Sequence, residues 1–189
     1  MGRIVVTEFI SLDGVVEDPG GSEDFKYGAW TFEIDRGDEG NRFKLEETME
    51  ADSQLLGRVT YEGFAEAWPS RDGEFADKFN EMPKYVVSST LRDPDWNNSH
   101  VLEGDPVEAV RKLREEQDGV ILVAGSVQLV QMLIENDLVD ELRLMVFPVV
   151  LGAGKQLWGE TSDKKRFRLK DSKVVGDGVA IMTYEQASG

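Results

Sequence analysis

Residues 119–136 read GVILVAGSVQLVQMLIEN and join the two kinds of segment from which the chain is built. The first part, Gly119 to Ala124, is a continuous apolar run, which is typical of a central β-strand covered on both faces. Gly125 and Ser126 interrupt this run, and Val127 to Asn136 then has the apolar spacing of an amphipathic helix. A buried strand that passes directly into a helix indicates an α/β protein.

The same alternation of strand-like and helix-like segments continues on both sides of this stretch. Apolar and β-branched runs predict strands at Arg3–Leu12, Ser53–Gly57, Lys84–Ser88 and His100–Leu102. Helical spacing predicts helices at Asn41–Ala51, Arg58–Trp68 and Phe75–Met82, and a further helix that opens with Asp105 and Pro106. Asp38 is expected to cap the first of these helices.

The C-terminal part of the chain is rich in β-forming residues. Glu141–Leu151 predicts one long strand, and Arg166–Val175 and Val179–Glu185 predict an antiparallel hairpin around Gly176-Asp177-Gly178. We therefore expect a single α/β domain over residues 1–189. Its central mixed sheet should be mainly parallel, flanked by helices and completed by the C-terminal antiparallel hairpin.

The composition narrows the classes of function. The chain has 21 Lys and Arg against 37 Asp and Glu, a formal net charge of −16. This argues against nucleic acid or an anionic membrane as the main partner, because binding a surface of many phosphates needs a large basic footprint. The absence of cysteine and the presence of a single histidine, His100, exclude disulfides, thiolate sites and multi-histidine metal sites, so no metal is expected. We find neither a signal peptide nor a membrane span, and we expect a cytoplasmic protein.

The charge is unevenly distributed along the chain. Residues 13–53 hold thirteen acids and four bases, whereas residues 163–173 hold six bases and two acids. The basic stretch fits a solvated edge strand, and the alternative is a patch that steers phosphate. Another interpretation of the overall acidity is adaptation to high salt, although ten lysines against eleven arginines show no strong depletion of lysine.

Three expected strand ends carry glycine or hydroxyl side chains, at Gly57–Thr60, Ser88–Thr90 and Ala124–Ser126. Free backbone N–H groups at the start of a helix suit a phosphate, and a glycine lets a ligand approach the backbone closely. If the strands are parallel neighbours, all three junctions lie at the edge of the sheet where ligands of open α/β sheets bind. The alternative is that each junction is an ordinary turn.

Other templates for catalysis or nucleotide binding do not match. No Gly-x-Ser-x-Gly elbow accompanies His100, and no G-x-G-x-x-G follows a predicted strand. The stretch Gly152–Lys155 lacks the Ser or Thr that follows the lysine of a phosphate-binding loop. The junctions are therefore the strongest candidate site.

Taken in order, these segments resemble the dihydrofolate reductase-like superfamily, and within it the reductase domain of bacterial riboflavin biosynthesis, the RibD C-terminal domain. The resemblance spans nearly the whole chain, through Ser11–Gly14, Leu56–Glu62, Lys84–Ser89, Val123–Ser126, Leu138–Leu142 and Pro148–Gly152. It implies the same central mixed sheet flanked by helices. It also implies a homodimer that acts on a small molecule.

The resemblance implies NADPH as cofactor. Its phosphates would meet Gly57–Thr60 on one side and Gly125–Val127 on the other. The expected cofactor-binding residues are Gly14, Val16, Gly57, Arg58, Val59, Thr60, Ser88, Ser89, Thr90, Ala124, Gly125, Ser126 and Val127. Asp13, Trp30 and Phe43 are expected to bind the substrate, and Asp13 to supply or orient a proton; the alternative is that Asp13 only opens a tight Asp-Gly turn.

The implied function is an NADPH-dependent reductase that transfers hydride to a C=N or C=O group of a small polar substrate, such as a pyrimidine or a pterin. The specific candidate is the reduction of 5-amino-6-(5-phosphoribosylamino)uracil in riboflavin biosynthesis. The polar loop over residues 14–37 would act as a lid. The alternative is a non-catalytic nucleotide-binding module, because Ala124 stands where riboflavin reductases carry an acid, and no acid after Trp30 is in register with that of folate reductases.

Overall fold

The computed structural model describes residues 1–187, which contain one mixed sheet with the strand order β4-β3-β2-β5-β1-β6-β8-β7. The strands are β1 (Arg3–Ser11), β2 (Ser53–Gly57), β3 (Lys84–Val87), β4 (Ser99–Leu102), β5 (Val120–Ala124), β6 (Glu141–Phe147), β7 (Phe167–Val175) and β8 (Val179–Gln186). The strands β4, β3, β2, β5, β1 and β6, which are neighbours in this order, all run parallel. Among the named strands, only β8 forms antiparallel pairs, with β6 and with β7. The expected α/β fold with a C-terminal hairpin is confirmed.

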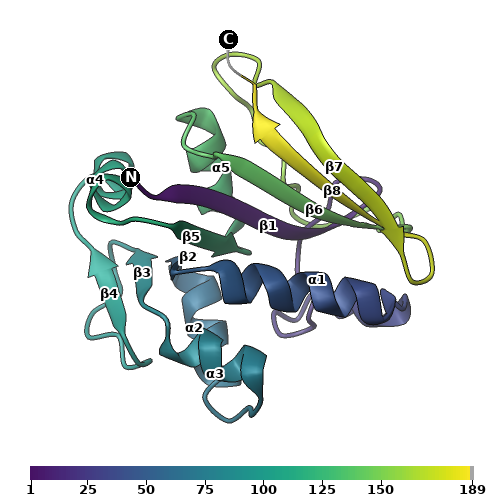
Figure 1. Ribbon diagram of the computed structural model, residues 1–189, viewed down its shortest axis with the longest axis horizontal. Coiled ribbons are helices and arrows are strands. Elements are labelled where there is room, and N and C mark those ends of the chain that lie inside the picture. The colour runs from purple at the N-terminus through teal and green to yellow at the C-terminus, as the bar shows by residue number, and fades with distance from the viewer. Residues whose placement is uncertain (188–189) are drawn as a thin grey trace.

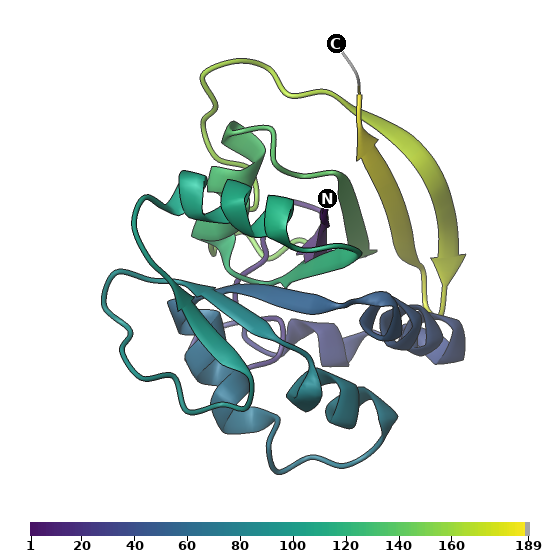
Figure 2. The same ribbon diagram turned by 60° about the vertical axis from the view of Figure 1, so that its left-hand side comes forward.

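Helices cover both faces of the sheet (Figures 1 and 2). One face packs against α4 (Pro106–Glu116) and α5 (Val127–Glu135). The other face packs against α1 (Gly37–Glu50), α2 (Arg58–Ala67) and α3 (Glu74–Glu81). This double cover is why β5 reads as an unbroken apolar run. Within residues 1–187, no helix combines the length and apolarity that crossing a bilayer requires.

Two predicted boundaries were wrong. Helix α1 begins at Gly37 rather than at Asn41, so Asp38 lies within its first turn and is not the cap. The acid that bonds the start of this helix is Asp35, which accepts a hydrogen bond from the Gly37 N–H at 2.7 Å. Strand β6 ends at Phe147 rather than at Leu151, because Pro148 has no N–H to donate to a strand ladder.

The long connection between β1 and α1 is held by its own polar contacts. The Asp18 carboxylate is buried and accepts hydrogen bonds from the backbone N–H groups of Ser22 and Glu23, at 2.6 and 3.0 Å. Trp30, in the short 3₁₀ helix η1 (Trp30–Glu33), is buried and donates from Nε1 to the Glu17 carbonyl at 2.9 Å. These contacts make the segment an ordered wall in this structure.

Lys84 is a fully buried lysine at the start of β3. Its ammonium group donates to the carbonyls of Asn80, Met82 and Asn97 at 2.7–2.9 Å and lies 4.2 Å from the centroid of the Trp96 ring. Burial lowers the pKa of Lys84 to about 8. The lysine thereby ties the end of α3 and the loop before β4 to the sheet.

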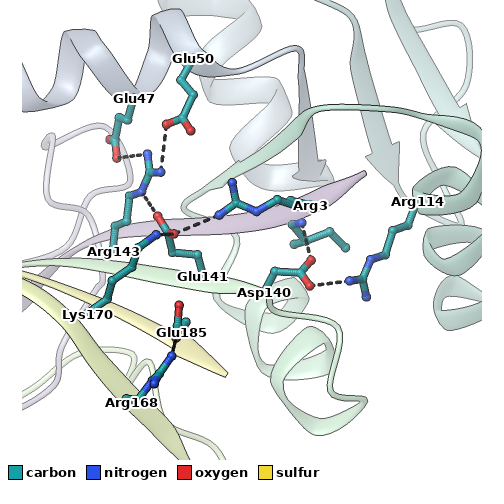
Figure 3. Close-up of polar contacts among 11 residues, drawn as sticks. Arg3, Glu47, Glu50, Arg114, Asp140, Glu141, Arg143, Arg168, Lys170 and Glu185 are labelled. Carbon is teal, nitrogen blue, oxygen red and sulfur yellow. Dashed lines mark hydrogen bonds and ion pairs between the residues drawn. The ribbon is translucent and has the colours of Figure 1, made fainter. Parts of the chain in front are cut away.

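A network of ion pairs connects α1 to strands β6, β1 and β7 of the sheet (Figure 3). Arg143 on β6 is largely buried, and its guanidinium donates to Glu141 at 2.6 Å and to Glu50 on α1 at 2.9 Å. Glu141 also accepts from Arg3 at 3.0 Å and from Lys170 at 2.9 Å. Burial alone would raise the pKa of Glu141, but its bonds to Lys170 and Arg143 outweigh burial and hold the pKa below its usual value.

Replacing Arg143 by methionine should lower the free energy of unfolding by about 2–3 kcal/mol, because the buried Glu141 would lose one of its three cationic partners and α1 would lose its ion pair with β6. The matched control is Arg168→Met, which breaks the exposed pair of Arg168 with Glu185 and should cost less than about 1 kcal/mol. Urea denaturation with an unchanged m-value measures both. Equal losses in the two variants would show that the Arg143 network does not hold the fold.

Candidate active site

The carboxyl ends of β3, β2, β5 and β1 open into one long cleft. Its lining comes from these strand ends and from residues of α1, α2 and the start of α5, and its volume is about 2760 Å³. Pockets for a single small ligand are usually roughly 300–1,000 Å³. The cleft therefore has room for an extended ligand together with a second, smaller one.

Two of the predicted junctions lie against each other in this cleft. The Gly57 N–H donates to Ser126 Oγ at 2.8 Å, which joins the end of β2 to the start of α5. Gly125 and Ser126 both have left-handed backbone angles, with φ of 67° and 66°. A Cβ atom on Gly125 would lie 3.3 Å from the side chain of Thr60, so this backbone is close to α2 as well. The predicted meeting of these strand ends is confirmed.

The helices that start at these junctions have open N-termini. Neither α2 nor α5 has a side-chain hydrogen bond to its first N–H groups. In contrast, Asp105 caps α4 as predicted, accepting from the N–H groups of Val107 and Glu108 at 3.0 and 3.1 Å. The open amides and the positive ends of α2 and α5 give the cleft a place for an anion that α4 does not offer.

The third junction lies in the same cleft, at its β3 end. Ser88 Oγ accepts hydrogen bonds from the N–H groups of Thr90 and Leu91 at 3.2 and 2.9 Å, which shapes the turn after β3. Ser89 and Thr90 are exposed and line the cleft, as does Arg92, which the sequence analysis did not single out. Two hydroxyls and a guanidinium are thus available to a ligand there.

The remaining residues predicted to bind the cofactor divide into two groups. Arg58 and Val59 are exposed in the cleft, and the Arg58 guanidinium is paired with Glu62 one turn along α2 at 2.9 Å. Val16, Ala124 and Val127 also line the cleft. Gly14 does not: it is buried, has a φ of 83°, and a Cβ atom there would lie 2.6 Å from Gln156 Oε1.

Asp13 lies outside the cleft lining and holds a loop. Its carboxylate accepts from Ser11 Oγ at 2.6 Å and from the N–H groups of Gly152 and Leu151 at 2.8 and 3.1 Å. These hydrogen bonds, that of Ser11 foremost, lower the pKa of Asp13 to about 2. A carboxyl with this pKa is ionised at neutral pH and has no proton to donate, so the geometry favours the structural alternative for Asp13.

Trp30 is buried in the core and Phe43 is partly buried against it, and neither lines the cleft. Both belong to the apolar cluster around Phe147, against whose ring Trp30 lies edge-on at 5.5 Å between centroids. The Lys173 ammonium lies 5.4 Å from the centroid of the Phe43 ring. The structure therefore does not bring either residue to the site, and the residue exposed beside Trp30 in the cleft is Phe32.

Titratable groups that the sequence analysis did not single out line the cleft below α1. Glu8 on β1 is buried, and burial raises its pKa to about 8. Across from it, Lys44 and Glu47 of α1 form an ion pair, and the Lys44 ammonium also donates to Thr7 Oγ at 3.1 Å. The only signal in the sequence is that Glu8 interrupts the apolar run of β1. Burial lowers the pKa of Arg36, which also lines the cleft.

Residues 1–187 contain no group of three or more His, Cys, Asp or Glu side chains placed to hold a metal ion. Several of the charged side chains of the cleft are instead paired with each other, as Lys44 is with Glu47 and Arg58 with Glu62. The arrangement offers anion-binding amides at one end and buried acids at the other.

The fold and the position of the cleft define the class of protein. Dihydrofolate reductase from Enterococcus faecalis, solved in complex with NADP(H), superposes with a TM-score of 0.58 at 15% identity, covering 98% of this chain and 97% of that one. A riboflavin biosynthesis protein (so described) from Shewanella sp. PV-4 superposes more closely, with a TM-score of 0.75 at 23% identity over 98% of this chain and 99% of that one. The fold is dihydrofolate reductase-like.

The family is more specific than the fold. The RibD C-terminal domain family matches residues 3–181, and the chain belongs to that family. The uncharacterized protein YwjB of Bacillus subtilis (strain 168) is 30% identical over 176 residues, which cover 91% of each chain. The bifunctional deaminase and 5-amino-6-(5-phosphoribosylamino)uracil reductase of Thermotoga maritima has the same fold, with a TM-score of 0.65 at 13% identity over 98% of this chain and 56% of that one. The resemblance inferred from the motifs is confirmed.

Replacing Asp13 by alanine should lower the free energy of unfolding at pH 7 by about 1 kcal/mol, the partly exposed site reducing the usual value of a charged hydrogen bond. Because the pKa of Asp13 is depressed in the folded state, its contribution is present above the unfolded pKa and is lost as the pH falls toward 2. Denaturation at pH 7 and pH 2.5 measures both effects, with Glu103→Ala as an exposed control. Equal stability of D13A and wild type at pH 7 would contradict the loop-holding role.

Proposed function

We propose that the protein is an NADPH-dependent reductase of a small polar substrate. The observation that carries the proposal is the contact between the open N-termini of α2 and α5, made through Gly57 and Ser126. Two convergent sets of free amides, with a glycine where a ligand can approach the backbone, fit a pyrophosphate. When bound, the cofactor supplies a hydride from its nicotinamide ring.

The chain's own residues would hold the cofactor along the cleft. The amides at Arg58–Thr60 and Gly125–Val127 would bind the two phosphates of the pyrophosphate, while Gly57 lets the ligand approach the backbone. Arg58 would exchange its exposed pair with Glu62 for a phosphate oxygen at little cost. Ser88, Ser89, Thr90 and Arg92 would meet the phosphorylated ribose. Val16 would border the nicotinamide end, below the wall formed by the connection between β1 and α1.

The substrate would occupy the end of the cleft between β1 and α1, whose lining is polar and charged. Arg36, Lys44 and Glu47 lie there, which favours a small heterocycle with several hydrogen-bonding groups over an apolar molecule. Family membership favours a pyrimidine such as 5-amino-6-(5-phosphoribosylamino)uracil, with the C=N or C=O group as hydride acceptor. In this proposal Asp13, Trp30 and Phe43 support the wall of the site from outside the cleft.

A non-catalytic nucleotide-binding module is the second candidate. It is motivated by Ala124, which lines the cleft beside Gly125 without offering an acid. Oxidation of NADPH in the presence of a pyrimidine, pterin or quinone acceptor would exclude this candidate. Homodimerisation and a cytoplasmic location stay predictions. A mass of twice that of the chain, measured by analytical ultracentrifugation, would support the dimer.

Wild-type protein should bind NADPH at least tenfold more tightly than NADH, because Ser89, Thr90 and Arg92 provide partners for the extra phosphate. Arg92→Ala should reduce this preference by roughly tenfold, a loss in the range of one charged hydrogen bond. The control is Arg111→Ala on the exposed side of α4. Isothermal titration calorimetry measures all six affinities. Equal binding of NADPH and NADH by wild type would reject these phosphate contacts, and no binding of either at millimolar concentration would reject the proposed function.

Gly125→Ala should weaken NADPH binding by at least tenfold, because the added Cβ atom strains a left-handed backbone and presses on Thr60 at 3.3 Å. Gly178→Ala is the matched control: it has the same strain at a φ of 91°, in the hairpin turn before β8 and away from the cleft. Affinities of both variants are measured at a temperature where circular dichroism shows them folded. A similar loss in G178A would trace the effect to stability rather than to the cleft.

A further inference from the structure

Glu8 lies where the central sheet opens. Strand β1 pairs with β5 as far as Thr7, opposite Ala124, while on its other side it continues to pair with β6 as far as Ser11. Glu8 is therefore the first residue of β1 beyond the end of β5, at the floor of the cleft. Its side chain is 4% exposed, and within residues 1–187 its Oε1 atom has no hydrogen-bond partner.

The charges around Glu8 leave it without a counter-ion of its own. Helix α1 presents Lys44 and Glu47, which are paired with each other, and Thr7 Oγ donates to Glu47 Oε1 at 3.0 Å. The turn between β5 and α5 presents only the backbone of Gly125, which weakly favours the ionised form. Arg36 donates to Asn41 Oδ1 at 2.7 Å, and the charges that act on its guanidinium are those of Glu47 and Asp35. An ionised Glu8 would add a net negative charge to this buried group.

Burial thus keeps the Glu8 carboxyl in its neutral form at neutral pH. Burial is the largest cause of its raised pKa, which lies at about 8, and Lys44 and Gly125 offset it only in part. A buried carboxyl without a partner destabilises a fold, because it has given up its bonds to water. An apolar residue at this strand position would avoid that cost, so the carboxyl calls for a functional explanation.

We propose that Glu8 is the acid that protonates the substrate as it is reduced. The inference rests on the proposed reductase function and adds the proton donor to it. The substrate carbon gains a hydride from the nicotinamide cofactor, the C=N π bond breaks, and its electron pair moves to the nitrogen. That nitrogen takes the proton from the Glu8 carboxyl, and the resulting carboxylate is reprotonated by water entering the cleft.

The position of Glu8 suits this role better than that of Glu47 or of Asp13, the acid predicted from the sequence. Glu47 is ion-paired with Lys44 and lies 3.9 Å from Arg143, so its carboxylate is already engaged with two cations. Asp13 is outside the cleft lining and has a pKa of about 2. Glu8 alone among these three combines access to the cleft with an acid that still holds its proton at pH 7.

The first experiment measures the acid itself and needs no substrate. In protein labelled with ¹³C-glutamate, the carboxyl resonance that disappears in Glu8→Gln should titrate with a midpoint near 8. Because the folded pKa is raised, stability should fall as the pH rises from the unfolded pKa to the folded one, so E8Q should gain melting temperature over wild type at pH 8.5 compared with pH 5. A midpoint below 6 would overturn the proposal.

The second experiment measures turnover. Oxidation of NADPH by pyrimidine and pterin acceptors should fall at least a hundredfold in kcat in E8Q, with NADPH affinity within twofold of wild type. Glu8→Asp should restore part of the rate, and the wild-type rate should decline as the pH rises through the Glu8 midpoint. An E8Q kcat within threefold of wild type would overturn the proposal. If wild type binds NADPH but reduces no acceptor, the reductase function fails, while the titration midpoint still decides whether Glu8 is a neutral acid.

Discussion

The placement of α1 against the sheet depends on one buried arginine. Arg143 on β6 donates from Nη2 to Glu50 on α1 and from Nε to Glu141 on its own strand. Its remaining nitrogen, Nη1, lies 3.9 Å from the Glu47 carboxylate. Glu47 in turn is paired with Lys44 at the cleft. The charges that surround the cleft floor are therefore a continuation of the ion pairs that hold the helix to the sheet, and stability and site geometry share the same side chains.

The sequence predicted the sheet and the meeting of the strand ends at Gly57 and Ser126 well, because both depend on local signals. The apolar run of β5 and its break at Gly125 are properties of adjacent residues, and parallel strands necessarily end at the same edge. The prediction that Asp38 caps α1 was wrong because cap preference alone does not decide between neighbouring acids. The helix starts at Gly37, whose N–H donates to Asp35.

The acids of the site could not be assigned from the sequence, since their state depends on distant partners. Asp13 opens an Asp-Gly pair, and its pKa is lowered first by the neighbouring Ser11 hydroxyl and then by the N–H of Gly152, which is 139 residues away along the chain. In the sequence, Glu8 is only a charged residue that interrupts an apolar strand. The structure adds that the nearby Lys44 and Glu47 are paired with each other. Family resemblance pointed to Trp30, yet the packing of its ring against Phe147 is a property of the tertiary structure.

The hydrogen bond between Gly57 and Ser126 joins residues 69 apart in the chain. Such a contact forms only after β2 and β5 have come together, and the loop closure between them must precede any gain from their pairing. A partly folded chain therefore lacks the part of the cleft where the N-termini of α2 and α5 meet. A ligand that binds there binds the native state alone, so its concentration in the cell would shift the folding equilibrium and protect the chain from proteolysis of its unfolded form.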